Sequence, residues 1–177
     1  MKLGLKNNEV RIVPFDEEWK VEFSNVKKEI QLTLDIDESR IEHIGSTAIE
    51  GMSAKPIIDI ILGVDDLKKI DQEMERKLRT IGFYRLRVER PNEVVFAKFK
   101  DDTFETKTHF IHTVVFKEEL WENLVFFRDY LNSNDEEKIA YAKLKEDYLR
   151  QAHAISIAEY TDYKEGFVKR IFSKRKL

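Results

Sequence analysis

The residues best suited to chemistry form a glycine-serine turn that is followed by a single carboxylate inside an apolar run. Gly45 allows the backbone to turn sharply, and the hydroxyl groups of Ser46 and Thr47 can donate hydrogen bonds to phosphate oxygens. Asp59 follows among isoleucine residues, where a carboxylate is costly unless it meets solvent, a cation or a ligand. The segment therefore predicts a phosphate-binding turn beside a carboxylate that binds Mg²⁺ or another divalent metal.

Two histidines, His109 and His112, lie in a segment that reads as a β-strand. Because side chains alternate along a strand, at most one of these rings can face the same side as Asp59. We expect this to be His112, which shares its side of the strand with Phe110 and Phe116. His112 would then serve as a general base, or as a nitrogen ligand that binds a metal together with Asp59. The alternative for either ring is a buried histidine that donates to a backbone carbonyl group.

Several basic side chains are candidates for contacts with the phosphates of a ligand. His43 directly precedes the turn and is either a phosphate contact, a third metal ligand, or a side chain that stabilises the turn. Lys55 is held extended by the proline that follows it. Arg128 lies beside the apolar stripe of a helix, where it can contact a phosphate bidentately or pair with a neighbouring acid. Lys145 and Lys164 are expected to form a basic wall over the site, although both would also suit a solvent-exposed helix.

The spacing of apolar residues predicts the elements that must position these side chains. A stripe from Trp19 to Leu34 predicts a helix that begins after Asp16, and the run at 56–64 predicts a central strand covered on both faces. Ser156 and Glu159 match the capping box of a last helix. The other expected elements are strands at 40–44, 83–88, 94–100 and 104–116, helical turns at 46–50, a helix over 67–81 capped by Asp65-Asp66, and further helices from 117 onward.

These elements predict an α+β fold, in which a small mixed β-sheet packs with helices and an all-helical third follows. A single domain over 1–177 is expected, with an α/β core at 9–116 and C-terminal helices at 117–173 packed on it. The chain has 177 residues, of which 42% are apolar, and this is enough to bury a sizeable core.

Composition and charge narrow the functional classes. The net charge of −3 gives no basic field for a polyanion, so nucleic acid is not expected as a partner. The absence of cysteine excludes disulfides, thiolate nucleophiles and zinc fingers. Neither a signal peptide nor a run of about 20 apolar residues is present, which predicts a cytoplasmic protein without a membrane partner.

A glycine-serine turn, a helical turn and a strand that carries an acid resemble the nucleotide site of the nucleotidyltransferase superfamily, the polymerase-beta-like fold. In that superfamily two acids, two positions apart on one strand, hold two magnesium ions that neutralise a triphosphate. The second position here is Ile61, so a single acid stands where the superfamily has a pair.

Residues spread over the chain carry a closer resemblance. They are Trp19, Phe23, His43-Ile-Gly-Ser-Thr, Gly51, Ala54-Lys-Pro-Ile-Ile-Asp-Ile, His109-x-x-His112, Phe127-Arg-Asp-Tyr-Leu, Tyr141, Leu144-Lys145, Tyr160 and Lys164. Over about residues 9–173 the chain resembles the GrpB-like family, which shares the nucleotidyltransferase fold and also lacks the second acid. The family's turn reads Ser-Thr-x-x-Pro-Gly, and Glu50 replaces the proline here, which leaves the loop less rigid. Some relatives are fused to dephospho-coenzyme A kinase, a hint at nucleotide or coenzyme A metabolism.

The resemblance implies a protein that binds a nucleotide or another phosphorylated small molecule and transfers a nucleotidyl group with a divalent metal ion. Two alternatives stay open. Ile61 favours a non-catalytic domain that binds a phosphate ligand or regulates another activity. The tyrosine- and phenylalanine-rich C-terminal helices would suit a module that binds another protein.

Overall fold

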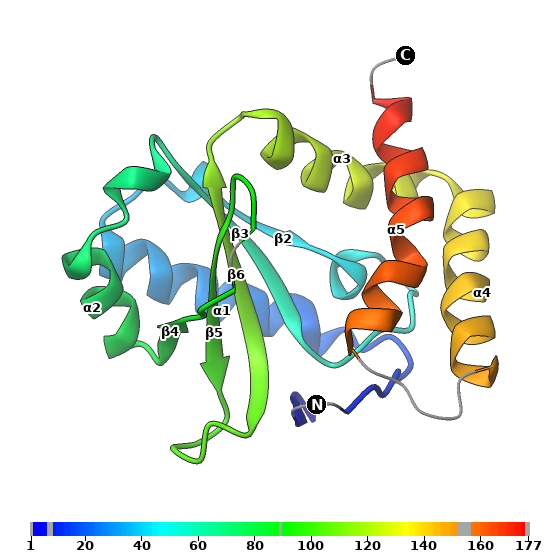
Figure 1. Cartoon of the computed structure of the whole chain (residues 1–177), viewed down its shortest axis with the longest axis horizontal. Coiled ribbons are helices and arrows are strands. Elements are labelled where there is room, and N and C mark those ends of the chain that lie inside the picture. The colour runs from blue at the N-terminus through cyan, green and yellow to red at the C-terminus, as the bar shows by residue number, and fades with distance from the viewer. Residues whose placement is uncertain (1, 7–8, 89, 152–156, 176–177) are drawn as a thin grey trace.

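The computed structural model describes residues 2–6, 9–88, 90–151 and 157–175, apart from the side chains of residues 151 and 157–161. Its centre is a six-stranded mixed sheet in the order β2-β3-β6-β5-β4, with β1 paired to β6 (Figure 1). The two central strands, β3 and β6, run parallel, and the other pairs are antiparallel. The strands are β1 (Leu5–Lys6), β2 (Ile41–Ile44), β3 (Ile58–Val64), β4 (Phe83–Arg85), β5 (Val94–Phe99) and β6 (Thr106–Val115).

Helices cover both faces of this sheet. In the described residues the α-helices are α1 (Glu18–Leu34), α2 (Gln72–Thr80), α3 (Glu119–Ser133), α4 (Asp135–Gln151) and α5 (Ile157–Lys174), and short 3₁₀ turns are η1 (Glu38–Arg40), η2 (Ser46–Ala48) and η3 (Leu67–Lys69). The mixed sheet, its helices and the helical C-terminal third agree with the fold class that the sequence predicted.

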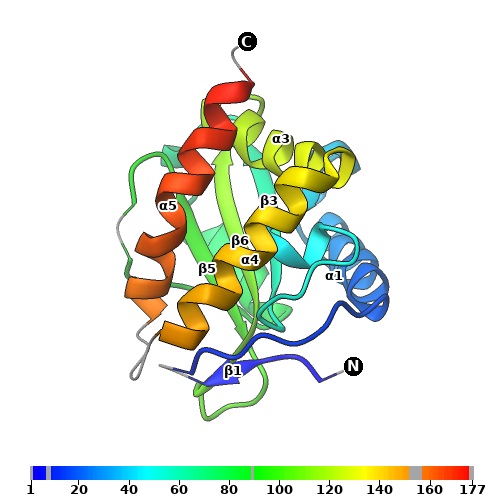
Figure 2. The same ribbon diagram turned by 90° about the vertical axis from the view of Figure 1, so that its right-hand side faces the viewer.

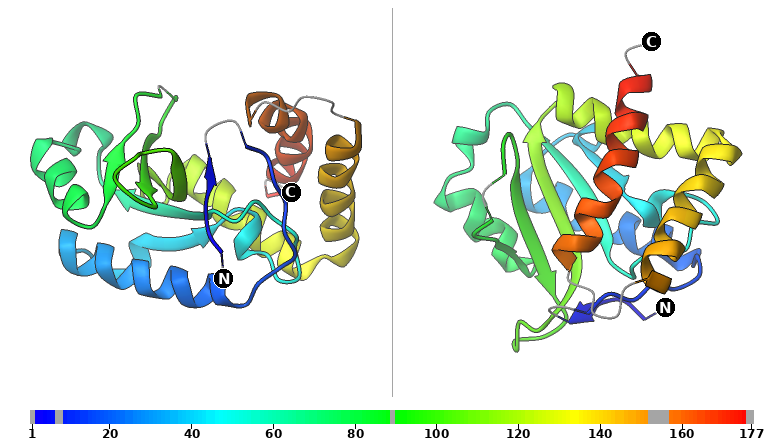
Figure 3. Two further views of the ribbon diagram at one scale, coloured as in Figure 1. Left: turned by 90° about the horizontal axis from the view of Figure 1, so that it is seen from below. Right: turned by 45° about the vertical axis from the view of Figure 1, so that its right-hand side comes forward.

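The first face of the sheet packs against α1 and α2. Trp19, Val26 and Ile30 of α1 and Leu78 of α2 are buried with the even-numbered residues of β3, from Ile58 onward. Burying such side chains stabilises by roughly 1.5–3 kcal/mol each relative to exposure. In the left-hand view of Figure 3, α1 (blue) runs along one face of the sheet, at the bottom of the picture.

The second face of the sheet carries the C-terminal helices. Ile61 of β3 packs with Val114 of β6 and Trp121 of α3. A further apolar cluster joins α3, α4 and α5 to the segment that follows the glycine-serine turn; its buried members are Ile49, Met52, Phe127, Leu131, Tyr141, Phe167 and Ile171. In Figure 2, α4 and α5 lie side by side in front of the sheet. The aromatic residues proposed as a surface for a protein partner therefore lie largely in an internal core.

The predicted helix over 67–81 is shorter than expected. Asp66 accepts a hydrogen bond from the backbone amide of Lys68 and caps only η3, whereas α2 begins after Asp71, whose carboxylate accepts from the amide of Met74. The chain holds two acids that can cap, and the second one sets the helix start. Ser156 and the side chain of Glu159, the predicted capping box, lie outside the described residues.

Candidate functional site

The register between β3 and β6 decides which predicted residues meet. Asp59 pairs with Phe110, and Ile61 pairs with His112, so Asp59 and His112 face the side of the sheet that α3 covers. His109 is opposite Ile58 and faces the α1 side, where it is buried. His112 is therefore the histidine that faces Asp59, as its place in the strand predicted.

His112 lies between two carboxylates. Its Nε2 is 3.5 Å from Oδ1 of Asp59, and its Nδ1 contacts Oε1 of Glu93, the residue just before β5. Burial acts to lower the pKa of His112, but the hydrogen bonds to Asp59 and Glu93 raise it to about 9. The ring is therefore a cation at neutral pH, with an N–H directed at each carboxylate.

Glu93 was not among the residues singled out from the sequence. It lies in a turn between β4 and β5, far along the chain from Asp59, and only the pairing of β5 with β6 brings it to His112. Burial acts to raise the pKa of Glu93, while the hydrogen bond to His112 lowers it overall. Its other oxygen, Oε2, is 3.4 Å from Nη1 of Arg90. No local motif marks such a residue, because its partner comes from a different strand.

The glycine-serine turn brings its backbone against the carboxylate of Asp59. Gly45 has φ 71° and ψ −170°, and a Cβ built on it would be 2.6 Å from Oδ2 of Asp59. Only glycine accepts both this conformation and this contact without strain. Ser46–Ala48 then form one 3₁₀ turn, as the sequence indicated.

Thr47 and His43 are directed away from this side of the sheet. The hydroxyl of Thr47 is buried, lies 2.9 Å from Nε2 of His43 and donates to the carbonyl of Ile57 at 3.4 Å. His43 stacks on Phe23 of α1, with ring centroids 4.8 Å apart. Burial lowers its pKa to about 4, although the charge of Asp59 acts in the opposite direction. His43 thus stabilises the turn through Thr47, which is one of the roles that the sequence left open for it, and the hydrogen bonds of both side chains are directed away from Asp59.

Ser46 points toward the C-terminal helices instead. Its hydroxyl lies 3.4 Å from Nζ of Lys145 and forms a hydrogen bond with Tyr141, both on α4. Lys145 is 2% exposed and donates to the carbonyl of Ser53 at 2.6 Å, with its ammonium group 4.8 Å from the centre of the Tyr141 ring. Burial raises the pKa of Tyr141 to about 12, so the phenol keeps its proton.

Three lysines from three elements lie within reach of one another's charges or of Asp59: Lys55 from the loop before β3, Lys145 from α4 and Lys164 from α5. We call them the lysine cluster. Burial and the charge of Lys164 lower the pKa of Lys145 to about 7 and that of Lys55 to about 8. Burial also lowers the pKa of Lys164 to about 8, although Asp59 opposes this shift. The charge of Lys164 thus acts on both other ammonium groups, and positive charges gathered in this way favour a nearby anion.

Arg128 of α3 links this helix to β2 through hydrogen bonds. Its guanidinium donates to Glu42 at 2.7 Å, to the carbonyl of His43 at 2.9 Å and to Asp129 at 2.7 Å. Nε and Nη1 are thus engaged by acceptors of the protein itself, and the contact with Asp129 is the pairing with a neighbouring acid that the sequence offered as the alternative to a phosphate contact. The hydrogen bonds to Glu42 and His43 dock α3 on the sheet.

Asn132 of α3 holds the end of the turn, a role that the sequence did not suggest. Its side chain accepts from the backbone amide of Glu50 at 2.8 Å and donates to the carbonyl of Ala48 at 3.1 Å. A proline at position 50 would have no amide to donate. The predicted loss of rigidity at Glu50 is therefore offset by two hydrogen bonds from the helix.

The donors near Asp59 do not fit a pair of divalent ions. Ile61 supplies no second carboxylate on the strand, and both nitrogens of His112 carry a proton directed at an acid. In the part of the chain that is described, no group of three or more histidine, aspartate or glutamate side chains is arranged to hold a metal ion. Two hard cations need more oxygen ligands than Asp59 provides.

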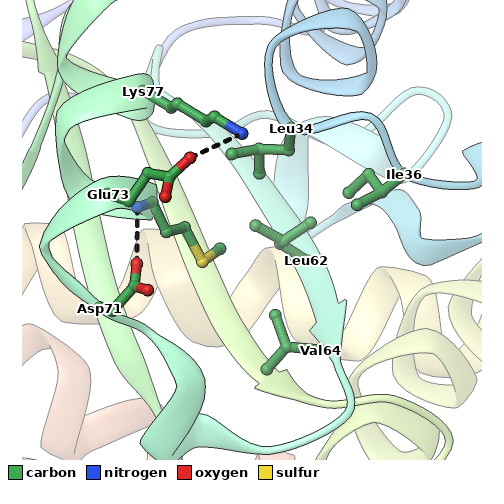
Figure 4. A pocket seen from close by; sticks show the side chains of 8 residues that line it. Leu34, Ile36, Leu62, Val64, Asp71, Glu73 and Lys77 are labelled. Carbon is green, nitrogen blue, oxygen red and sulfur yellow. Dashed lines mark hydrogen bonds and ion pairs between the residues drawn. The ribbon is translucent and has the colours of Figure 1, made fainter.

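Two hollows lie elsewhere on the molecule. An apolar pocket of about 220 Å³ lies between α1 and α2. Figure 4 shows Leu62 and Val64 of β3 among the side chains that line it. These residues alternate with Asp59 along the strand and so face the opposite side of the sheet. A larger surface hollow of about 1030 Å³ lies along α2 and β4 and is bordered by Arg79, Arg85 and Glu93. Neither hollow contains a member of the lysine cluster.

Residues 9–174 match the family described as GrpB protein. The chain belongs to the GrpB family. It is 37% identical over 173 residues to the glutamate-rich protein GrpB of Alkalihalophilus pseudofirmus, a match that covers 97% of this chain and 99% of that protein. A dephospho-CoA kinase of Mycolicibacterium paratuberculosis is 30% identical over 107 residues, which are 59% of this chain and 25% of the kinase. The expected likeness to such kinases is thus seen over part of the chain.

Solved structures agree on the fold. The crystal structure of the conserved protein GrpB from Enterococcus faecalis superposes with a TM-score of 0.77 at 26% identity, covering 93% of this chain and 96% of that one. Cid1, described by its RNA terminal uridylyl transferase activity, superposes with a TM-score of 0.52 at 13% identity, covering 76% of this chain and 41% of Cid1. The fold of this GrpB protein is therefore similar to that of the nucleotidyltransferases. No helix of the described residues is long and apolar enough to cross a membrane.

Proposed function

We propose that this GrpB protein binds a nucleotide or another phosphorylated small molecule through its phosphate groups, between the sheet and the helices α4 and α5. The observation that carries this proposal is the lysine cluster: burial lowers the pKa of all three lysines, and the charge of Lys164 lowers those of Lys55 and Lys145 further. A phosphate placed between these ammonium groups would relieve the repulsion and restore their protonation. Ser46 adds a hydroxyl that already contacts Lys145 and can donate to the same phosphate.

Asp59 is the second part of the proposed site. Its side chain is 32% exposed, and it lies against Gly45 at the beginning of the turn. A partly exposed carboxylate next to a phosphate cradle can accept a hydrogen bond from a hydroxyl group, as a ribose or another sugar would offer. The likeness to nucleotidyltransferases supports a nucleotide as the first ligand class to test.

The test is thermal unfolding of the wild type and of Lys164→Met against nucleoside mono-, di- and triphosphates and coenzyme A precursors, in buffer with Mg²⁺. A ligand at about 100 times its Kd stabilises by roughly 2.7 kcal/mol, which is a shift of roughly 5–10 °C for a protein of this size. We expect this shift in the wild type and its loss in Lys164→Met. Lys143→Met on the exposed side of α4 is the matched control and should keep the shift. Failure of every phosphate ligand to shift the wild type would refute the proposal.

A second candidate function is transfer of a nucleotidyl group. One observation favours it: Asp59 and the His112 imidazolium are in hydrogen-bonding distance on the same side of the sheet, so a proton acceptor and a proton donor meet there. The measurement is release of pyrophosphate from nucleoside triphosphates in the presence of an acceptor mixture. Turnover that Asp59→Asn removes would support transfer, while binding without turnover would leave a phosphate-ligand binder or regulatory domain.

A further inference from the structure

Nucleotidyltransferases need a second acid on the strand that carries the first one. In this protein a cation on the neighbouring strand lies beside that position. Ile61 is that position on β3, and the parallel register places His112 of β6 directly beside it. One strand thus lacks a negative charge while its neighbour carries a positive one. The two departures lie side by side and affect the same carboxylate, Asp59.

His112 places a positive charge beside the carboxylate of Asp59, as a bound metal ion would. It contacts one oxygen of the carboxylate, Oδ1, and its far nitrogen is fixed by Glu93, whose side chain is 9% exposed. The ring cannot rotate away without leaving both acids unpaired, because both nitrogens are engaged. Asp59 is therefore partly neutralised before any ion is added, and it repels an approaching phosphate less than a bare carboxylate would.

The lysine cluster supplies the second contribution of metal ions, which is positive charge beside the phosphates. In nucleotidyl transfer the ions neutralise the negative charges of the phosphates. Here the ammonium groups of Lys55 and Lys164 lie close enough to Asp59 to feel its charge, and Lys145, near Lys164, is only 2% exposed and is fixed by the carbonyl of Ser53. Such preorganised cations bind phosphate oxygens through short, charge-assisted hydrogen bonds.

We infer that this protein binds the di- or triphosphate group of its ligand without a divalent metal ion, with His112 neutralising Asp59 and the lysine cluster contacting the phosphates. The inference rests on the proposed function, since it concerns how the same site recognises phosphate. It assigns Glu93 as a positioning residue, which acts on the ligand only through His112. The ligand class that fits is a compound with at least two linked phosphate groups, because the cationic groups come from three separate elements.

Calorimetric titration with inorganic tripolyphosphate, in EDTA and then in excess Mg²⁺, tests the inference on the full chain. Tripolyphosphate has no base or sugar, so it reports on the phosphate contacts alone. We expect binding in EDTA that is as tight as, or tighter than, binding in Mg²⁺, because the ion competes with the lysines for the same oxygens. Binding that requires Mg²⁺ would overturn the inference and leave the proposed function standing. Absence of binding in both buffers would overturn both.

Substitutions further distinguish binding through the lysines alone from binding through a metal ion. Asp59→Asn should leave the affinity for tripolyphosphate unchanged or raise it, since it removes a negative charge, whereas a metal bridge through Asp59 would be lost. Lys164→Met should weaken binding about tenfold to a hundredfold, the usual effect of one charge-assisted contact. His112→Gln frees the charges of Asp59 and Glu93 and should weaken binding as well, and the added change Asp59→Asn should restore part of it. A His112→Gln protein that binds as tightly as the wild type would contradict the role assigned to the imidazolium.

Discussion

Gly45 and Asp59 are in contact across the first two strands of the site: a Cβ on the glycine would lie 2.6 Å from Oδ2 and 3.1 Å from Cβ of the aspartate. Ile44 pairs with Asp59 in the antiparallel ladder, so the residue after it passes directly over the carboxylate. The glycine-serine turn and the acid are therefore not two independent motifs. The turn can adopt its path only because position 45 has no side chain.

Gly45→Ala is expected to lower the free energy of unfolding by about 2–4 kcal/mol, since it adds both backbone strain and a steric clash. Gly51→Ala is the matched control: its φ is 74°, yet a Cβ added there would have nothing within 4 Å, so it should cost only about 1 kcal/mol. Denaturant unfolding of both variants gives the comparison. Equal costs for the two would show that the contact with Asp59 is unimportant.

Lys145→Met should stabilise the free protein while it removes phosphate binding. Methionine is similar in length and carries no charge into the buried position, so we expect a gain of about 1–3 kcal/mol at pH 7. Most binding-site mutations lower affinity without raising stability, and this combination distinguishes a buried functional cation from a structural one. Urea unfolding and thermal shift with a phosphate ligand measure the two effects; a loss of stability would contradict the prediction.

The pH dependence of that gain has a definite sign. The pKa of Lys145 falls from 10.5 to about 7 on folding, so the unfolded chain binds more protons between these two values and the wild type becomes more stable as the pH rises. The advantage of Lys145→Met should therefore be largest at pH 7 and shrink toward pH 10.5. Unfolding curves at pH 7, 8.5 and 10 suffice, and a constant difference across them would argue against a lowered pKa.

His112 contributes with the opposite sign. Its pKa rises from 6.5 to about 9 on folding, so the stability that it supplies is complete below pH 6.5 and is lost as the pH rises through 9. His112→Gln should cost about 1–3 kcal/mol at pH 6 and much less at pH 10. NMR titration of the ring in the wild type reports the pKa directly, and a value near 6.5 would remove the basis of this prediction.

Arg128→Met is expected to destabilise by about 1–3 kcal/mol, because it leaves Glu42 and the carbonyl of His43 without their donor. Its side chain is 16% exposed, so solvent replaces the lost partners only in part. Arg150→Met on α4, where the guanidinium is 75% exposed and pairs with Glu146, should change stability by less than about 0.5 kcal/mol. Chemical denaturation compares the two variants, and a small effect at position 128 would contradict its role in linking α3 to β2.

Local patterns in the sequence predicted most of the elements. The stripe from Trp19 to Leu34 and the apolar run at 56–64 correspond to α1 and β3, because burial and period are local properties of the chain. Alternation along the strand correctly placed His112 rather than His109 beside Asp59. The predicted start of α2 was wrong because two aspartates, Asp66 and Asp71, can each cap a helix, and the local sequence does not decide between them.

The members of the candidate site were harder to predict, since their roles depend on partners far along the chain. His43, Thr47 and Arg128 have the right chemistry for phosphate, but their hydrogen bonds are directed to the core and to the link between α3 and β2. Glu93 and Asn132 look ordinary in the sequence and gain their roles from β6 and from the turn. Residue type indicates what a side chain can do, while the fold decides which partner it meets.

The apolar cluster of the C-terminal helices also contains Ile49 and Met52, which belong to the segment that follows the glycine-serine turn. A chain ended after residue 116 would expose both side chains beside this turn, together with Ile61, which would lose Trp121. The sheet and the helical third are therefore expected to melt together in one cooperative transition. A change at the turn would then affect the stability of the whole molecule, because the same few side chains close the core and support the turn.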